Sequence, residues 1–209
     1  MDRKLVCGIG INDSDYVVKV TEEMGYTGGG KRLRKLVWIC PYYRTWFDMI
    51  NRCYNVKSKT RESWYEHSSV DERWHRFSVF RAWMVNQRWC DEEGNKFCLD
   101  KDILANDPNI KVYSPETCCF VPTAINVFVT ERSLGASGVR GVLKVGDKYR
   151  AQSGNGKVSF TIGIFNTVEE AYNAWLEYKQ QRVAEFSEVY KLENKVKEAL
   201  ELRYKGGLM

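Results

Sequence analysis

The chain has 209 residues, a formal net charge of +5 and 44% hydrophobic residues. This length and apolar content suffice for one large or two small domains with buried cores, which excludes a disordered polar tail. No stretch is long and apolar enough to cross a membrane, so we expect no membrane partner. The seven cysteines are odd in number, lack CxxC spacing and follow no apolar leader, which predicts reduced thiols in a cytoplasm.

The first thirty residues alternate weakly between apolar and polar positions and end in three glycines, residues 28–30. We interpret the glycines as a flexible joint. Nine basic and two acidic residues follow between Lys31 and Glu62, a net charge of +7. This charge density attracts phosphate, so we expect its first basic side chains to contact nucleic acid: Lys31, Arg32, Arg34 and Lys35. An ordinary solvated face is the alternative.

Two amphipathic helices are predicted next, because apolar side chains recur at helical spacing over residues 43–54 and again over 74–84. The polar segment between them is expected to be an exposed loop. A zinc site formed by Cys40, Cys53 and one of the two histidines is an alternative that no established ligand spacing supports.

A strand–loop–strand–helix pattern follows. Residues 97–99 form a short strand that runs into Asp100, Lys101 and Asp102, residues 118–121 form a buried strand, and a helix beginning at Pro122 carries Asn126. A one-metal nuclease needs ligands for a divalent ion on the scissile phosphate and a base that activates water. A hairpin of this kind can place both groups at the end of its first strand and a second ligand on its helix.

These residues resemble the HNH nuclease motif of phage homing endonucleases, through the runs LDKD at 99–102, SPETCCFV at 114–121 and IN at 125–126. The resemblance implies that Asp100 and Asn126 bind Mg²⁺ or another divalent cation. It places Lys101 and Asp102 at the catalytic position.

The chain departs from this family at two positions. Lys101 stands where the family has its base histidine, and Thr117 stands where it has a structural asparagine. A lysine is ordinarily protonated near neutral pH and acts as a base only when strongly desolvated; otherwise it serves as a positive charge beside the phosphate. Taken singly, the carboxylates are also explained as solvated groups at a strand end, and Asn126 as a capping amide.

Residues 131–138 (ERSLGASG) are predicted to be a linker between two domains. Beyond it, Thr167 and Glu170 form a capping box that opens a helix, and a further helical segment reaches about Tyr204. Three short strands precede the capping box, with a turn at residues 153–156; they are expected at residues 140–144, 148–153 and 157–165.

Strand alternation places one polar set on the sheet face that points away from the helix: Lys148, Arg150, Gln152, Lys157, Ser159 and Thr161. Such a face can enter the major groove of DNA, where arginine pairs with guanine and glutamine with adenine. A sheet whose polar face merely meets solvent is the alternative.

This region also resembles the APETALA or ethylene-response-factor type of DNA-binding domain, which is found appended to phage homing nucleases. The resemblance covers residues 138 to about 180, through the runs GVRGV at 138–142, KYRA at 148–151, IGIF at 162–165 and TVEEAY at 167–172. It implies that Arg140 and Arg150 contact bases and that Lys144 and Lys148 contact phosphates. Leu143 and Tyr149 stand where the family often has arginine and tryptophan, so the base-reading set is smaller.

We therefore expect an α+β fold, with an HNH-like ββα-metal core followed by a three-stranded antiparallel sheet packed on one helix. The expected domains are an N-terminal extension (1–35), the nuclease-type core (36–132), the DNA-binding domain (133–188) and a C-terminal helix (189–209). The expected function is binding of double-stranded DNA with metal-dependent hydrolysis, by nicking or cutting, in the host cytoplasm if the chain is phage-encoded. The alternatives are a catalytically inactive DNA-binding or regulatory protein on the same scaffold, and a protein-binding role for the tryptophan-rich helices.

Overall fold

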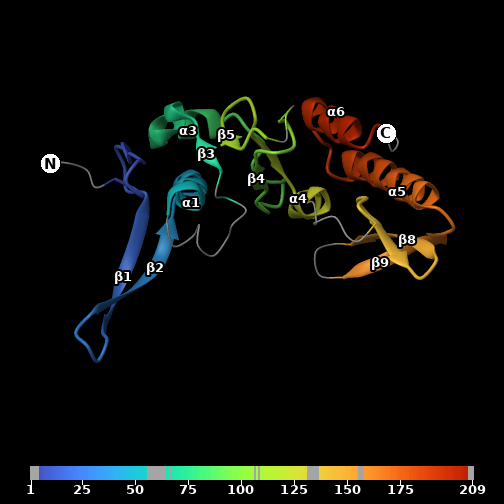
Figure 1. The fold of residues 1–209 in the computed structure, drawn as a ribbon. Helices are drawn as coiled ribbons and strands as arrows, with labels where there is room; N and C mark the ends of the chain where they lie inside the picture. The colour runs from blue at the N-terminus through green and yellow to red at the C-terminus, as the bar shows by residue number, and fades with distance from the viewer. Residues whose placement is uncertain are drawn as a thin grey trace. The chain divides into compact units, whose positions relative to one another are not determined.

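The computed structural model describes residues 5–55, 65, 67–105, 107, 109–130, 137–154 and 158–206. Helices and small sheets are mixed along the chain, which confirms the α+β class (Figure 1). The chain divides into two compact units. Unit 1 comprises residues 1–89 and 105–118, and unit 2 comprises residues 90–104 and 119–209.

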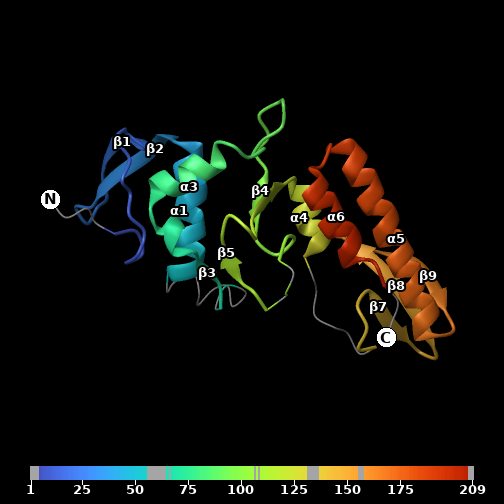
Figure 2. The ribbon, with the colours of Figure 1, turned by 90° about the horizontal axis from the view of Figure 1, so that it is seen from above.

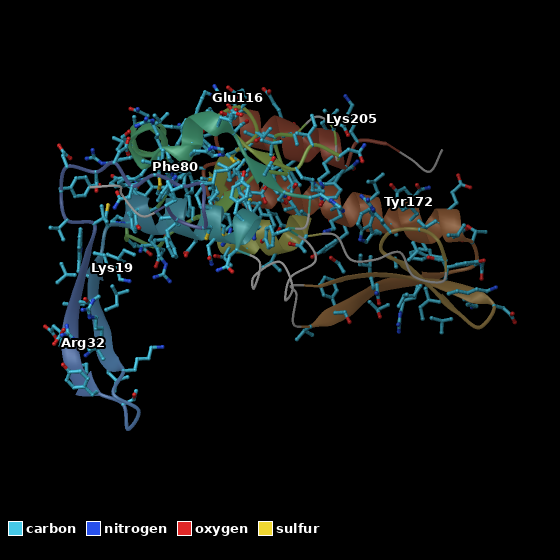
Figure 3. The ribbon with its side chains drawn as sticks, turned by 60° about the vertical axis from the view of Figure 1, so that its left-hand side comes forward. Lys19, Arg32, Phe80, Glu116, Tyr172 and Lys205 are labelled. Atoms are coloured by element: carbon cyan, nitrogen blue, oxygen red, sulfur yellow. The ribbon has the colours of Figure 1, made fainter. Side chains whose placement is uncertain are left out.

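Unit 1 begins with an antiparallel ribbon of β1 (Lys19–Tyr26) and β2 (Arg32–Ile39), which extends away from the helices of its unit (Figures 1 and 3). The expected flexible joint at residues 28–30 is instead the tight connection between these strands. Its geometry explains the glycines, because Gly30 has a φ of +74°, which favours a residue without a Cβ. The basic run therefore lies on a strand.

The rest of unit 1 is a helical core with one small parallel sheet. Its elements are α1 (Pro41–Tyr54), β3 (Ser69–Val70), the 3-10 helix η2 (Glu72–His75), α3 (Phe77–Met84) and β5 (Val112–Tyr113), which pairs with β3. The predicted helical faces meet in this core, where Trp46, Trp74, Phe77 and Phe80 are fully buried. The Trp46 indole N–H donates to the Trp74 carbonyl at 2.7 Å, so this buried ring is also hydrogen-bonded.

Unit 2 contains the predicted strand–strand–helix hairpin. Strand β4 (Cys98–Asp100) pairs antiparallel with β6 (Cys119–Val121), and α4 (Thr123–Val129) follows after Pro122. Helix α4 packs against β4.

The C-terminal part of unit 2 is a three-stranded antiparallel sheet packed on a long helix, as predicted (Figure 2). Both reciprocal bonds of the capping box form between Thr167 and Glu170. A second helix packs against the first. The elements are β7 (Val142–Val145), β8 (Lys148–Gly154), β9 (Ser159–Phe165), α5 (Val168–Val189) and α6 (Asn194–Arg203).

One hydrophobic core joins the hairpin to the C-terminal sheet and helices. Ile125 and Phe128 of α4 belong to the same buried cluster as Ala151 of β8, Trp175 of α5 and Leu200 of α6. The hairpin strands and α4 are thus packed with the segment that follows them, although residues 131–136 of the predicted linker lie outside the described residues.

No cysteine of the chain takes part in a disulfide. Among the described residues, no helix has the length and apolar character needed to cross a membrane.

Candidate active site and nucleic-acid interface

Asp100 closes the first strand of the hairpin, opposite Cys119. The residue is 8% exposed, and its Oδ1 accepts the backbone N–H groups of Asp102 and Ile103, each at 2.8 Å. Burial raises the pKa of this carboxyl, and the two N–H bonds oppose the increase only in part. The anionic form is therefore costly here, and a bound cation would stabilise it.

Lys101 and Asp102 form an ion pair beside Asp100. The Lys101 Nζ lies 2.8 Å from both carboxylate oxygens of Asp102. The lysine side chain is 6% exposed and that of Asp102 is 45% exposed, so the carboxylate is the accessible member of the pair. The lysine acts in this pair as a hydrogen-bond donor.

Asn126 lies in the middle of α4 and is half-buried. Its backbone N–H donates to the Pro122 carbonyl at 3.1 Å, and its own carbonyl accepts the Thr130 hydroxyl at 2.7 Å. The side-chain amide is not needed for either helical bond, which leaves its oxygen available as a ligand.

Thr117, one of the two positions at which the sequence departs from the expected motif, lies in a turn of unit 1. Its hydroxyl donates to the Val112 carbonyl at 2.6 Å and accepts the Ser114 N–H at 3.1 Å. The threonine hydroxyl thus joins the two ends of the turn between Val112 and Thr117 by hydrogen bonds. An asparagine side chain can make bonds of the same kind.

The zinc alternative finds no support in the described part of the chain, where no three His, Cys, Asp or Glu side chains gather in a group that could hold a metal. Cys40 and Cys53 are buried. His75 contacts the Val70 carbonyl at 3.2 Å within unit 1.

The open face of the C-terminal sheet carries Arg150 at its centre. Cross-strand register places Arg150 between Leu143 of β7 and Ile164 of β9. Its Nε is buried without a hydrogen-bond partner among the described residues. A guanidinium whose stem lies between two apolar side chains on an open sheet face is suited to an external acceptor. Exposed Ile164 beside it offers an apolar contact that sequence reasoning missed.

The same register distributes the other candidate side chains of this sheet. Lys148 lies opposite Val145 on the Arg150 face, and Gln152 lies opposite Thr161 after a β-bulge. Lys144 lies opposite Tyr149, whose ring packs against the core, so the register assigns Lys144 to the helix side of the edge strand. Lys157 lies outside the described residues.

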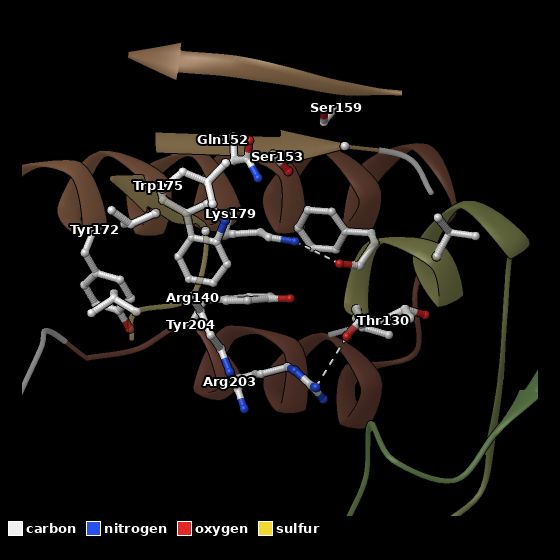
Figure 4. Close-up of a pocket in the computed structure, with 18 residues that line it drawn as sticks. Thr130, Arg140, Gln152, Ser153, Ser159, Tyr172, Trp175, Lys179, Arg203 and Tyr204 are labelled. Carbon is white, nitrogen blue, oxygen red and sulfur yellow. Dashed lines mark hydrogen bonds between the residues drawn. The ribbon is translucent and has the colours of Figure 1, made fainter. Parts of the chain in front are cut away.

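Arg140 lies in the turn before β7 and is exposed. It lines a pocket of about 560 Å³ within unit 2, together with Trp175, Lys179, Arg203 and Tyr204 (Figure 4). Three of these five side chains are cationic, so the pocket has a basic lining.

The β1–β2 ribbon presents a second basic surface, in unit 1. Arg32 and Arg34 share one face with Glu23. Their guanidinium nitrogens lie 3.1 and 3.6 Å, respectively, from the Glu23 Oε1. Lys19 lies on that same face near the base of the ribbon, with Arg32 toward its tip (Figure 3). Lys35 pairs in register with Glu22 on the opposite face. The ribbon therefore has a basic face with three cations and one carboxylate, and a second face on which the charges balance.

Both ribbon faces also carry exposed apolar side chains, which sequence reasoning missed. Trp38 lies opposite Val20 and is 47% exposed, and Leu33 follows on the same face. The sequence pattern that could have predicted this ribbon is the alternation of apolar and polar residues on both sides of the glycine turn.

No protein-family model, curated protein or solved structure matches the chain.

Proposed function

We propose that this protein binds double-stranded DNA and hydrolyses its phosphodiester bonds with a divalent metal, as an endonuclease of the HNH homing type. The observation that carries the proposal is the order β4–β6–α4, with Asp100 at the end of the first strand and Asn126 on the helix that packs against it. A one-metal nuclease needs ligands that hold a divalent ion on the scissile phosphate, and a strand end and a helix packed against it can supply them.

The donor set suits a magnesium-type ion. Asp100 and Asn126 offer oxygen ligands, which hard divalent cations prefer, and Mg²⁺ is commonly held by one or two protein groups plus substrate phosphates. The ion, when bound, would polarise the scissile phosphate and stabilise the charge that develops on it. Asp100 would then be ionised, because the cation offsets the cost of burying its charge.

The ion pair next to Asp100 supplies the remaining roles. Asp102 is the more exposed member and is the group that would accept a proton from water. Lys101 fixes the Asp102 carboxylate through contacts with both oxygens and adds positive charge beside the phosphate.

Two basic surfaces support the DNA partner. The open sheet face offers Arg150, Lys148 and Gln152 for base and phosphate contacts, flanked by apolar side chains that fit thymine methyl groups. The β1–β2 ribbon offers Lys19, Arg32 and Arg34 on one face of an element narrow enough for a major groove.

A second candidate function is DNA binding without cleavage. It is favoured by the contacts of Lys101, which donates to Asp102 where a nuclease of this type has a neutral histidine. In that case Asp100 serves only to close the turn after β4 through its bonds to the N–H groups of Asp102 and Ile103.

The experiment that separates these candidates is nicking of supercoiled plasmid with Mg²⁺ or Mn²⁺, with DNA binding measured in parallel. The proposal expects nicking by the natural chain that disappears in Asp100→Ala and Asn126→Ala, while both variants still bind DNA. Binding without nicking by the natural chain would support the second candidate. Nicking that survives both substitutions would overturn the proposed site.

A further inference from the structure

Lys179 is a buried charged residue on α5, far along the chain from the hairpin. The residue is 7% exposed, and its Nζ donates to the Phe128 carbonyl at 2.8 Å. The ammonium lies 3.7 Å from the centre of the Phe128 ring, 5.5 Å from that of Trp175 and 5.4 Å from that of Tyr204 (Figure 4). A carbonyl and three aromatic rings offset the cost of removing this charge from water.

The partner of Lys179 is the C-terminal end of α4. Phe128 and Val129 are the last two residues of that helix, so no backbone N–H of the helix donates to their carbonyls. Arg203 of α6 approaches the Val129 carbonyl at 3.4 Å. Positive charge at a helix C-terminus is favourable, and here one cation from α5 and one from α6 supply it.

Helix α4 depends on these outside contacts because it has only seven residues. A helix that short is not stable alone, so tertiary packing fixes its position. The buried side chains Ile125 and Phe128 hold it against the core, and Lys179 holds its end. Asn126 lies between the buried residues Ile125 and Phe128, two positions before the carbonyl to which Lys179 donates.

We propose that Lys179 is a positioning residue of the hairpin metal site: through the Phe128 carbonyl it holds α4, and with it the amide of Asn126, where a divalent cation can be shared with Asp100. This inference depends on the proposed function. It makes the C-terminal helices part of the catalytic unit, so the metal site is complete only when α5 is folded against α4.

The test uses the full chain and Mn²⁺ as the probe, with binding followed by the electron paramagnetic resonance signal of free Mn²⁺. Lys179→Met keeps most of the side-chain length and loses the charge, Lys179→Arg keeps the charge, and Lys195→Met removes a charge from an exposed position on α6 as a control. Hydrogen exchange of the α4 backbone, relative to α5, reports the position of the helix independently of metal.

We expect Lys179→Met to speed exchange in α4 and to weaken Mn²⁺ binding about fivefold or more, with most of the affinity restored in Lys179→Arg and no change in Lys195→Met. Should Lys179→Met not fold, Arg203→Gln replaces it, with the same direction and a smaller effect. Unchanged Mn²⁺ affinity in a folded Lys179→Met, or in its replacement, overturns the inference.

Asp100→Asn separates this result from a failure of the proposed function. If Asp100→Asn binds Mn²⁺ as well as the natural chain does, the hairpin is not the metal site, and both proposals fall. If Asp100→Asn loses binding and Lys179→Met does not, the hairpin site stands and only the role of Lys179 is lost.

Discussion

The Lys101 ammonium contacts both carboxylate oxygens of Asp102, each at 2.8 Å, at the position where the proposed type of nuclease has a histidine. A neutral imidazole accepts a proton near pH 7, whereas an ammonium does not. We therefore expect Lys101→His to raise the rate of Mg²⁺-dependent plasmid nicking about tenfold or more, since a general base contributes about 10²–10⁴-fold.

Lys101→Met is the matched control, because it removes the charge without adding a base. It should nick no faster than the natural chain. Equal rates for Lys101→His and Lys101→Met would contradict the prediction, because they would show that a histidine at position 101 does not act as a base in this site.

Asp100 should lower the stability of the fold at neutral pH, where its ionised form is needed for function. Its pKa is raised by burial, so the folded state holds the proton more tightly than the unfolded state does, and stability falls as pH rises from the unfolded pKa through the folded pKa. Asp100→Asn removes the charge and keeps an oxygen for the N–H groups of Asp102 and Ile103. We expect a Tm at pH 7 equal to or above that of the natural chain, together with loss of nicking. A lower Tm with nicking retained would contradict the assignment.

Gly141 is required by close packing as well as by its backbone angle. Its φ is +72°, and a Cβ would lie 2.2 Å from the Trp175 ring. Gly146 has a φ of +60° and no atom near the position of a Cβ, so its substitution by alanine measures the cost of the backbone conformation alone. Urea unfolding should show a loss of about 1 kcal/mol for Gly146→Ala and about 1–3 kcal/mol more for Gly141→Ala. Equal losses would show that the Trp175 ring moves away freely.

Asp13 should make unit 1 sensitive to acid. Burial alone raises the pKa of this carboxyl, but hydrogen bonds from the Ser78 hydroxyl and N–H, at 2.7 and 2.8 Å, together with a backbone bond of Asp13 itself and the nearby Arg76 charge, outweigh it and lower the pKa. The stabilisation is therefore complete above the unfolded pKa and disappears as pH falls through the folded pKa. Asp13→Ala should cost about 1 kcal/mol at pH 7, as loss of a helix cap does, and less as the pH is lowered toward 2. A cost that stays constant with pH would exclude the charge as its origin.

The strands and helices of the C-terminal module follow from its sequence because alternation, glycine turns and the capping box all act locally. Thr167 and Glu170 form both bonds of that box, and the strands lie within two residues of their expected ends. The strand–strand–helix order of the hairpin follows for the same reason. The ribbon was missed because its alternation is weak, and because three glycines are equally compatible with a joint and with a hairpin turn.

The contacts that define the site could not be predicted, because they join residues that are distant in sequence. The bond between Lys179 and the Phe128 carbonyl spans 51 positions. The packing of α4 with Trp175 and Leu200 in one core likewise depends on tertiary burial, which no local pattern encodes. The β-bulge after Ala151 is a further example, since it shifts the register of Gln152 relative to β9.

The most direct test of the account is the salt dependence of binding to a labelled double-stranded DNA, followed by fluorescence anisotropy for the natural chain and for Lys148→Ala, Lys144→Ala and Lys195→Ala. We predict affinity that falls steeply between about 50 and 200 mM salt. Lys148→Ala should reduce the slope of log affinity against log salt by about 1, and Lys144→Ala by less, because only Lys148 shares the Arg150 face. Affinity that is absent or independent of salt in the natural chain would contradict the DNA-binding claim, and equal slopes in all three variants would remove the open sheet face from it.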